Sequence, residues 1–153
     1  MVQEVKLRES KWGELPWRFE AGTPAIEEGI ALGTAIDYLK NIGMDSIEDH
    51  ERQIVAYAME RLSEIDGIEI YGPSSEQRGG LVSFNLAGIQ PHDIAAALDY
   101  EGITIRAGHH CAQPLHEKLG IKASARASFC FYNTMEEVDK LVDCLHKAKK
   151  VLG

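Results

Sequence analysis

Hydrophobic residues recur at helical spacing along much of the chain. In the stretch 45–67, for example, Ala58, Leu62 and Ile65 fall on one face of a helix. The same spacing predicts long helices over residues 23–43, 45–67, 91–100 and 134–152. A shorter helix is expected at 114–119.

Four shorter stretches alternate between apolar and polar positions, which predicts β-strands. They cover residues 68–71, 81–86, 103–106 and 125–131. Alternation places Val82 and Phe84 on the face of their strand that packs inward. In the last strand it places Ala127 inward and Arg126 on the opposite, polar face.

Polar residues at the predicted helix starts indicate where caps form. Thr23 is placed to cap the first helix, with Pro24 at the first helical position. Asp45–Glu48 resembles a capping box before the second helix, and Thr134–Glu137 is a capping box before the last one. The inward face of that last helix is expected to run as far as Leu152.

Helices alternate with short strands, and a helix closes the chain. This order predicts an α/β fold (an α+β two-layer sandwich), in which helices cover one face of a short, mostly antiparallel sheet. The first residues lack periodicity but include Trp12 and Trp17, which need a surface to pack on. We therefore predict an N-terminal arm and linker at 1–22 and a small α/β domain at 23–153.

Charge and composition exclude several classes of function. The 153 residues carry a net charge of −8 and include 44% hydrophobic and 26% charged residues, which is typical of a globular domain. The basic cluster Lys147, Lys149 and Lys150 is better placed to complement a helix dipole than to bind nucleic acid. No apolar run is long enough to span a membrane, and the polar N-terminus lacks the apolar stretch of a secretory signal. We therefore expect neither nucleic acid nor membrane as a partner.

The chain has three cysteines, Cys111, Cys130 and Cys144, an odd number without the paired spacing of a disulfide framework. We therefore expect a reducing, cytoplasmic compartment in which free thiols persist. Cys130 and Cys144 are expected to be structural, although Cys130 shares the polar strand face of Arg126.

The segment RAGHHCAQP, residues 106–114, follows a predicted strand and holds the first of these cysteines. Most free cysteines are small buried apolar residues. Beside Arg106, His109 and His110, however, a thiolate at Cys111 would be favoured. Residue types alone leave a packed thiol and a reactive thiol equally open.

A metal site is another interpretation of this segment. His110, Cys111 and His116 are the candidate ligands, but neither a CxxC nor an HxxxH spacing supports them. We therefore expect no metal.

Arg126 also has two interpretations. It could form a salt bridge on an exposed sheet face, which residue type alone favours, or hold a carboxylate through two parallel hydrogen bonds. A weaker signal is Gly22-Thr23-Pro24, whose exposed N–H groups precede a predicted helix and could receive a phosphate.

Several segments together resemble the C-terminal part of group II, Suf-type cysteine desulfurases, which are close relatives of selenocysteine lyases in the aminotransferase class V family. They are RFEAGTP (18–24), YGP (71–73), RAGHHCAQP (106–114), RAS (126–128) and YNTMEEVDKLV (132–142). The resemblance extends from about Pro16 to Gly153. It implies the small C-terminal domain of a pyridoxal-phosphate enzyme of fold type I.

The resemblance implies a role for each matching position. Cys111 matches the cysteine that takes sulfur from L-cysteine as a persulfide, releasing L-alanine and supplying iron–sulfur cluster assembly. Arg126 matches the arginine that holds the substrate carboxylate, and Arg106 matches an arginine lining the same pocket. Gly22 and Thr23 match a stretch that resembles the one touching the cofactor phosphate of the neighbouring subunit. Without the large domain, the sheet face and the Trp12/Trp17 arm would be exposed, and because a large apolar patch invites self-association we expect a homodimer.

Two departures from the family pattern limit what the chain is expected to do. Ala25 stands where relatives often have Asn. The family's pyridoxal phosphate is bound to a lysine of a preceding large domain, and the His146-Lys147 pair here lacks that context. The resemblance therefore implies that residues 1–22 come from that large domain, and that the chain alone is inactive and binds no cofactor covalently. Its expected partners are the large domain, L-cysteine, a Suf-type sulfur-acceptor protein and a second copy of the chain.

A different class of function stays open at this point. The chain could be a stand-alone module whose exposed thiol carries sulfur or docks a partner protein. A regulator that binds metal through His110, Cys111 and His116 is a third interpretation.

Overall fold

The computed structural model describes residues 1–153, which divide into two compact units, Met1–Gly43 and Met44–Gly153. The sequence predicted the domain to begin at residue 23, whereas the larger compact unit begins after the first long helix. That helix buries none of its residues, so it is not part of the larger unit's core. The predicted division at residues 22 and 23 stays a prediction about the parent protein.

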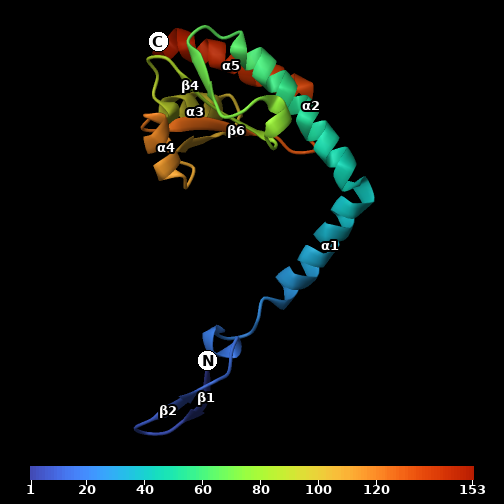
Figure 1. Cartoon of the computed structure of the whole chain (residues 1–153), viewed down its shortest axis with the longest axis vertical. Coiled ribbons are helices and arrows are strands. Elements are labelled where there is room, and N and C mark those ends of the chain that lie inside the picture. The colour runs from blue at the N-terminus through green and yellow to red at the C-terminus, as the bar shows by residue number, and fades with distance from the viewer. The chain divides into compact units, whose positions relative to one another are not determined.

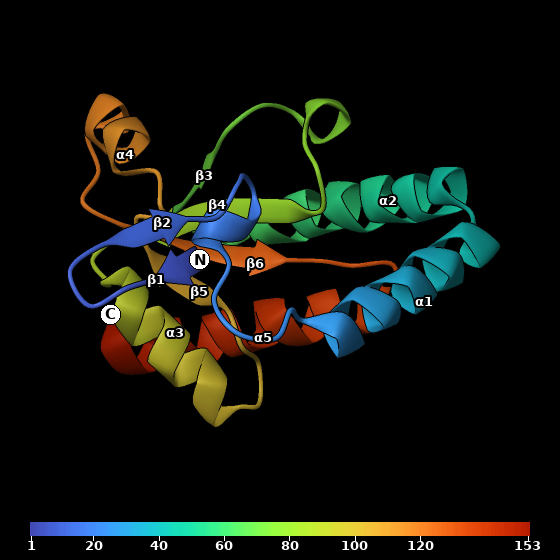
Figure 2. The ribbon, with the colours of Figure 1, turned by 90° about the horizontal axis from the view of Figure 1, so that it is seen from below.

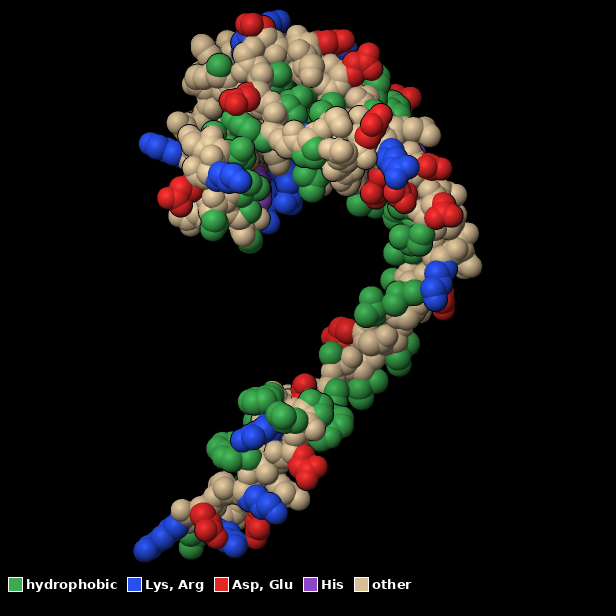
Figure 3. All heavy atoms as spheres, viewed as in Figure 1, with side chains coloured by type: hydrophobic (Ala, Val, Ile, Leu, Met, Phe, Trp, Pro, Cys, Tyr) green, Lys and Arg blue, Asp and Glu red, His purple; other side chains and the backbone are tan.

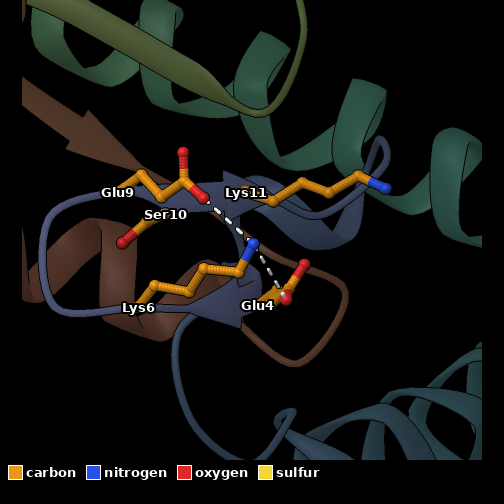
Figure 4. A pocket seen from close by; sticks show the side chains of 5 residues that line it. All are labelled: Glu4, Lys6, Glu9, Ser10 and Lys11. Carbon is orange, nitrogen blue, oxygen red and sulfur yellow. Dashed lines mark hydrogen bonds and ion pairs between the residues drawn. The ribbon is translucent and has the colours of Figure 1, made fainter.

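The unit Met1–Gly43 begins with a two-stranded antiparallel sheet, made of β1 (Val2–Val5) and β2 (Ser10–Trp12). The sequence predicted an irregular arm here, which is wrong. The hairpin was missed because its strands show no apolar alternation, and both strands are exposed. Lys6 lies near the turn, with its Nζ 3.0 Å from Glu9 Oε1 and 3.6 Å from Glu4 Oε1 (Figure 4). Such exposed pairs contribute little stability.

A short 3-10 helix, Trp17–Phe19, leads to α1 (Ile26–Ile42). The prediction that Thr23 caps this helix is wrong: Ala25 is the N-cap residue and makes no side-chain cap bond. The N–H of Ile26 donates to the Pro24 carbonyl at 2.8 Å, so a turn precedes the helix and Pro24 lies outside it. The helix ends at Ile42 with Gly43 as its C-cap residue, at the predicted place.

The unit Met44–Gly153 contains four helices, four strands and a 3-10 turn. They are α2 (Met44–Ser63), β3 (Ile68–Tyr71), the turn Ser75–Gln77, β4 (Leu81–Leu86), α3 (Pro91–Tyr100), β5 (Arg106–Gly108), α4 (Gln113–Leu119), β6 (Ser124–Ser128) and α5 (Met135–Leu152). The strand order is β3-β4-β6-β5, and every neighbouring pair is antiparallel. Helices α2 and α5 lie on one side of this sheet (Figures 1 and 2), and α3 packs against α5 and the sheet. The predicted α/β fold with a small antiparallel sheet is confirmed.

The core lies between these three helices and the sheet. Val82 and Phe84 of β4 are fully buried, together with Ala125 of β6, as the alternation predicted. The opposite side of the sheet, which we call the open face, carries partly or fully exposed residues such as Ser83 and Arg126. Of the α-helices in the unit Met44–Gly153, only the short helix α4 lies on that side (Figure 1).

Two strands differ from their predicted ranges. β5 begins at Arg106: the N–H of Ile103 still donates to the Leu98 carbonyl of α3, and residues 103–105 have no regular structure. β6 ends at Ser128 instead of residue 131. There the Cys130 N–H donates to Asn133 Oδ1 at 2.8 Å, which turns the chain toward α5.

Helix ends were predicted with mixed success. The Thr134–Glu137 capping box of α5 is present in full. The Asp45–Glu48 box is wrong, because α2 begins one residue earlier, at Met44. Leu152 is also wrong as a core residue, since 42% of its surface is exposed at the end of the last helix. None of the helices is both long and apolar enough to cross a bilayer.

Candidate functional site

The segment between β5 and α4 forms a tight loop, which we call the Cys111 loop (residues 109–112). Gly108 has a φ of 126°, which suits a residue without a Cβ. His110 and Cys111 follow with φ values of 53° and 59°, in the left-handed region that non-glycine residues seldom adopt. The N–H of Ala112 donates to the His109 carbonyl at 2.8 Å and closes the turn. Because of these φ values, the side chains of His110 and Cys111 leave the backbone in directions that neither a strand nor a right-handed helix would give.

The Cys111 side chain is exposed, so the interpretation of this residue as a packed apolar thiol is wrong. Arg106 Nη2 donates to Cys111 Sγ at 3.3 Å. The contact places a cation against the sulfur of an exposed thiol. The catalytic role of Cys111 stays a prediction.

Arg106 and Arg126 lie directly opposite each other on β5 and β6, and Ser83 of β4 is the next partner in the same row. Arg126 forms no salt bridge, which excludes the interpretation that residue type favoured. Its Nε is buried and has no hydrogen-bond partner. Two arginines in register without a carboxylate form a site that suits an anionic group.

Two of the cavities beside the loop are each lined by one of the paired arginines. The first, which we call the Cys111 cavity, has a volume of about 430 Å³ and is lined by Arg106, Ala107, His109, His110, Cys111, Gln113 and Pro114. The second, which we call the α4 cavity, has a volume of about 360 Å³. It lies between α4 and the open face, with Leu115 and Leu119 on one side and Leu81 and Arg126 on the other. Neither cavity is lined by an acidic residue or a lysine, so both carry positive charge only.

The two histidine rings of the metal interpretation contact a serine. His110 Nε2 and His116 Nε2 each lie 3.0 Å from Ser124 Oγ, and the ring centroids are 5.7 Å apart. No group of three His, Cys, Asp or Glu side chains in the structure is placed to hold a metal ion. Burial, followed by the charge of Arg126, lowers the pKa of His110 and favours the neutral ring.

Sequence reasoning missed Ser124, which is 2% exposed at the start of β6. No motif marks it, because its partners come from the loop and from α4. The other two cysteines differ in burial: Cys144 is buried in the core, as a structural residue would be, and Cys130 is partly buried.

Gly22 and Thr23 belong to the unit Met1–Gly43, whereas Cys111 and both arginines belong to the larger unit. Gly22 has a φ of 74°, and a Cβ added there would meet no atom within 4 Å. Both residues are exposed, and no side chain caps the helix that follows. This open backbone fits the approach of a phosphate, although the assignment to a cofactor stays a prediction.

Comparison with known proteins identifies the family. The aminotransferase class-V family model matches residues 1–141. The chain is 52% identical over 153 residues to a cysteine desulfurase of Haloferax volcanii, covering 100% of this chain and 36% of that protein. It is also 52% identical over 153 residues to a probable cysteine desulfurase of Halalkalibacterium halodurans, covering 100% of this chain and 37% of that protein.

Solved structures agree with this result. The apo cysteine desulfurase of Thermococcus onnurineus NA1 matches with a TM-score of 0.83 at 43% identity, over 99% of this chain and 38% of that one. The cysteine desulfurase CsdA of Escherichia coli, in its S-sulfonic acid form, matches with a TM-score of 0.84 at 33% identity, over 100% of this chain and 38% of that one.

The predicted resemblance to cysteine desulfurases is therefore confirmed, and the chain spans 36–38% of the length of these relatives. The family match and the sequence identity place it in the same group of proteins. The chain belongs to the aminotransferase class-V family.

Proposed function

We propose that this chain supplies the sulfur-accepting thiol of a cysteine desulfurase, with Cys111 as the nucleophile. One observation carries the proposal: the exposed Cys111 thiol lies 3.3 Å from a guanidinium nitrogen of Arg106, which is itself in register with Arg126. This arrangement combines a nucleophile with two cations that can hold an anionic amino-acid substrate. The identity to cysteine desulfurases supports L-cysteine as that substrate.

Pyridoxal phosphate, when the complete enzyme binds it, supplies the electron sink for bond changes in the amino acid. In this chain we assign Gly22 and Thr23 to its phosphate, because their backbone is open and precedes a helix N-terminus. No lysine lines either cavity beside Cys111. The covalent link to the cofactor is therefore assigned to the large domain, and we propose that the chain alone is inactive.

Arg126 binds and orients the substrate. A carboxylate that accepts two hydrogen bonds from one guanidinium is fixed in direction as well as in position. In this role the buried Nε of Arg126, which has no partner within the chain, gains one. Holding the substrate in one orientation accounts for much of the rate that an active site contributes.

Cys111 performs the sulfur transfer. Its thiolate attacks the substrate Sγ, a new S–S bond forms, and the substrate Cβ–Sγ bond breaks with its electron pair left on carbon. Protonation of that carbon gives L-alanine, and the outer sulfur remains on Cys111 as a persulfide. Arg106, which already contacts Cys111 Sγ, stabilises the negative charge of the thiolate and then of the persulfide.

Further parts of the proposal concern partners. We infer that the persulfide passes to a Suf-type acceptor protein for iron–sulfur cluster assembly, and that the protein acts in the cytoplasm, where its three free thiols persist. We also infer a homodimer, supported by the apolar side chains that α1 exposes (Figure 3).

The test of the nucleophile uses the chain mixed with the large domain of a close relative, with L-alanine formation from L-cysteine as the readout. Cys111→Ala should abolish the activity, and Cys130→Ala, at a partly buried thiol that follows β6, should leave most of it. Activity that survives Cys111→Ala would refute the proposed role.

In the same assay Arg126→Ala should raise KM for L-cysteine by about tenfold or more, because a hydrogen bond to a charged group contributes about 1.5–3 kcal/mol. Arg126→Lys should recover only part of this loss, since an ammonium cannot make the bidentate contact. An unchanged KM in both variants would remove Arg126 from the substrate site.

The isolated chain, mixed with pyridoxal phosphate and then dialysed, should retain no cofactor absorbance. A band that survives dialysis, and that borohydride fixes onto one specific lysine, would contradict the assignment of the covalent link to the large domain.

A further inference from the structure

The Ser124 side chain joins the two ends of the Cys111 loop. Its hydroxyl lies 3.0 Å from the Nε2 of His110, the residue before Cys111. It also lies 3.0 Å from the Nε2 of His116, on α4 just after the loop. Ser124 and His116 are 2% and 4% exposed, so the contact between them is buried, whereas the contact with His110 is partly buried.

Two backbone carbonyls fix the direction of the hydrogen bonds, because a carbonyl oxygen only accepts. His110 Nε2 lies 3.0 Å from the Ser124 carbonyl oxygen, so that nitrogen carries the proton. His116 Nδ1 lies 3.1 Å from the Ala112 carbonyl oxygen, so in that ring Nδ1 carries it. A neutral imidazole has one N–H.

The directions then follow for the whole chain of contacts. The single Nε2–H of His110 is shared between the Ser124 carbonyl oxygen and Ser124 Oγ, and the Ser124 hydroxyl donates to the bare Nε2 of His116. The two rings are therefore opposite tautomers. Exchanging either ring for the other tautomer places a ring lone pair against a carbonyl lone pair.

These contacts oppose the strain in the loop. His110 and Cys111 both hold left-handed φ values, 53° and 59°, which persist only where the surroundings over-determine the backbone. Ser124 anchors the residue before Cys111 and the helix after it from one fixed position on β6.

We propose that Ser124 is a positioning residue: through His110 and His116 in opposite tautomers, it holds the left-handed turn that keeps the Cys111 thiol against Arg106. The inference deepens the proposed function, since it matters for sulfur transfer only if Cys111 is the acceptor. The hydrogen bonds and the turn themselves are present in the chain without substrate or cofactor, so they can be tested without desulfurase activity.

The experiment measures two properties of the whole chain. Nitrogen-15 NMR of the imidazole rings reads the tautomers, and iodoacetamide alkylation followed by peptide mass spectrometry reads the reactivity of Cys111 separately from the other thiols. The wild-type chain should show His110 protonated at Nε2 and His116 protonated at Nδ1.

Ser124→Ala should slow Cys111 alkylation by about three- to tenfold, the factor that corresponds to the loss of one typical hydrogen bond. The thiol then spends less time beside Arg106, and the His116 ring loses its fixed tautomer. Ser124→Thr keeps the hydroxyl and should restore both the rate and the tautomers. Ser128→Ala, an exposed serine on the same strand, is the matched control and should change neither.

A wild-type alkylation rate and unchanged tautomers in Ser124→Ala would overturn the proposal. If that variant does not fold, the wild-type spectrum still tests the proposal. The same tautomer on both rings would be incompatible with the hydrogen bonds that run from His110 through Ser124 to His116. The other outcome separates the two ideas. If Ser124→Ala changes the alkylation rate and the tautomers as expected, but the wild-type chain mixed with the large domain forms no L-alanine, only the proposed function is refuted.

Discussion

The two units of the chain bury very different amounts of side chain. In Met44–Gly153, Phe84, Ile94 and Leu98 are fully buried in one core. In Met1–Gly43 no residue is buried, and apolar side chains such as Ile30 are exposed, by 69% in that case. Both units have regular secondary structure, so the difference lies in packing and not in local conformation.

This contrast shows what hydrophobic periodicity does and does not predict. Helical spacing in α1 and α2 predicted both helices, yet α2 buries Ile54, Ala58 and Leu62 while α1 buries nothing. Most helical stability in proteins comes from tertiary packing of an apolar face. The stability of α1 therefore depends on a surface that the larger unit's core does not include.

The largest expected effect compares one substitution in each unit. Phe84→Ala should lower the free energy of unfolding by about 3–5 kcal/mol, because Phe84 is fully buried. Phe19→Ala, at a side chain that is 79% exposed, should change it by less than about 0.5 kcal/mol. Urea unfolding followed by circular dichroism measures both. Equal losses would contradict the difference in packing between the units.

Two glycines give the next test. A Cβ at Gly80 would lie 2.5 Å from the Phe129 carbonyl oxygen, so Gly80→Ala should cost about 1–3 kcal/mol of stability. Gly33 of α1 has no atom within 4 Å of such a Cβ, and Gly33→Ala should stabilise that helix by about 1 kcal/mol. Thermal unfolding reports the first and helical circular dichroism the second. A stabilising Gly80→Ala would show that the backbone just before β4 can move away from the Phe129 carbonyl.

Helix caps give a smaller effect. Thr134 accepts a hydrogen bond from the Glu137 N–H and completes a capping box, so Thr134→Ala should cost about 1 kcal/mol. Thr23 makes no cap bond, and Thr23→Ala should stay within about 0.5 kcal/mol. The same urea titration serves for both. A matching loss at Thr23 would indicate that its hydroxyl has a partner in solution.

The smallest effect is a dependence of stability on pH. The folded pKa of His110 is lowered by burial and by Arg126, so the unfolded chain binds the proton more tightly. Stability from this group is complete above about pH 6.5, the ordinary value, and is lost as pH falls toward the lower folded pKa. His110→Gln should therefore flatten the change in urea midpoint between about pH 7 and about pH 5. A steeper change in this variant would reverse the assigned direction.

Much of the larger unit was predictable from sequence, because its strands and helices repeat simple patterns. Val82, Phe84 and Ala127 followed from alternation, and the α5 cap followed from Thr134 and Glu137. These features depend on neighbours along the chain. The exposed hairpin β1–β2 was missed because its residues show no alternation.

The site was predictable only in part. Residue types and the family resemblance selected Cys111, Arg106 and Arg126, but only the structure put the two arginines in register. Ser124 gave no signal, because its role depends on two rings that reach it from another segment. Strand register and side-chain contacts between distant segments are set by tertiary packing, which one sequence does not display.

The paired arginines on β5 and β6 have a consequence for the folded state as a whole. Like charges opposite each other cost free energy, so the domain is held together less well when nothing lies between Arg106 and Arg126. Any anion that bridges them stabilises the folded chain by mass action, in proportion to RT ln(1 + [L]/Kd). The melting temperature of this protein should therefore rise with the concentration of an anion that bridges the two arginines. Added salt also reduces their repulsion by screening.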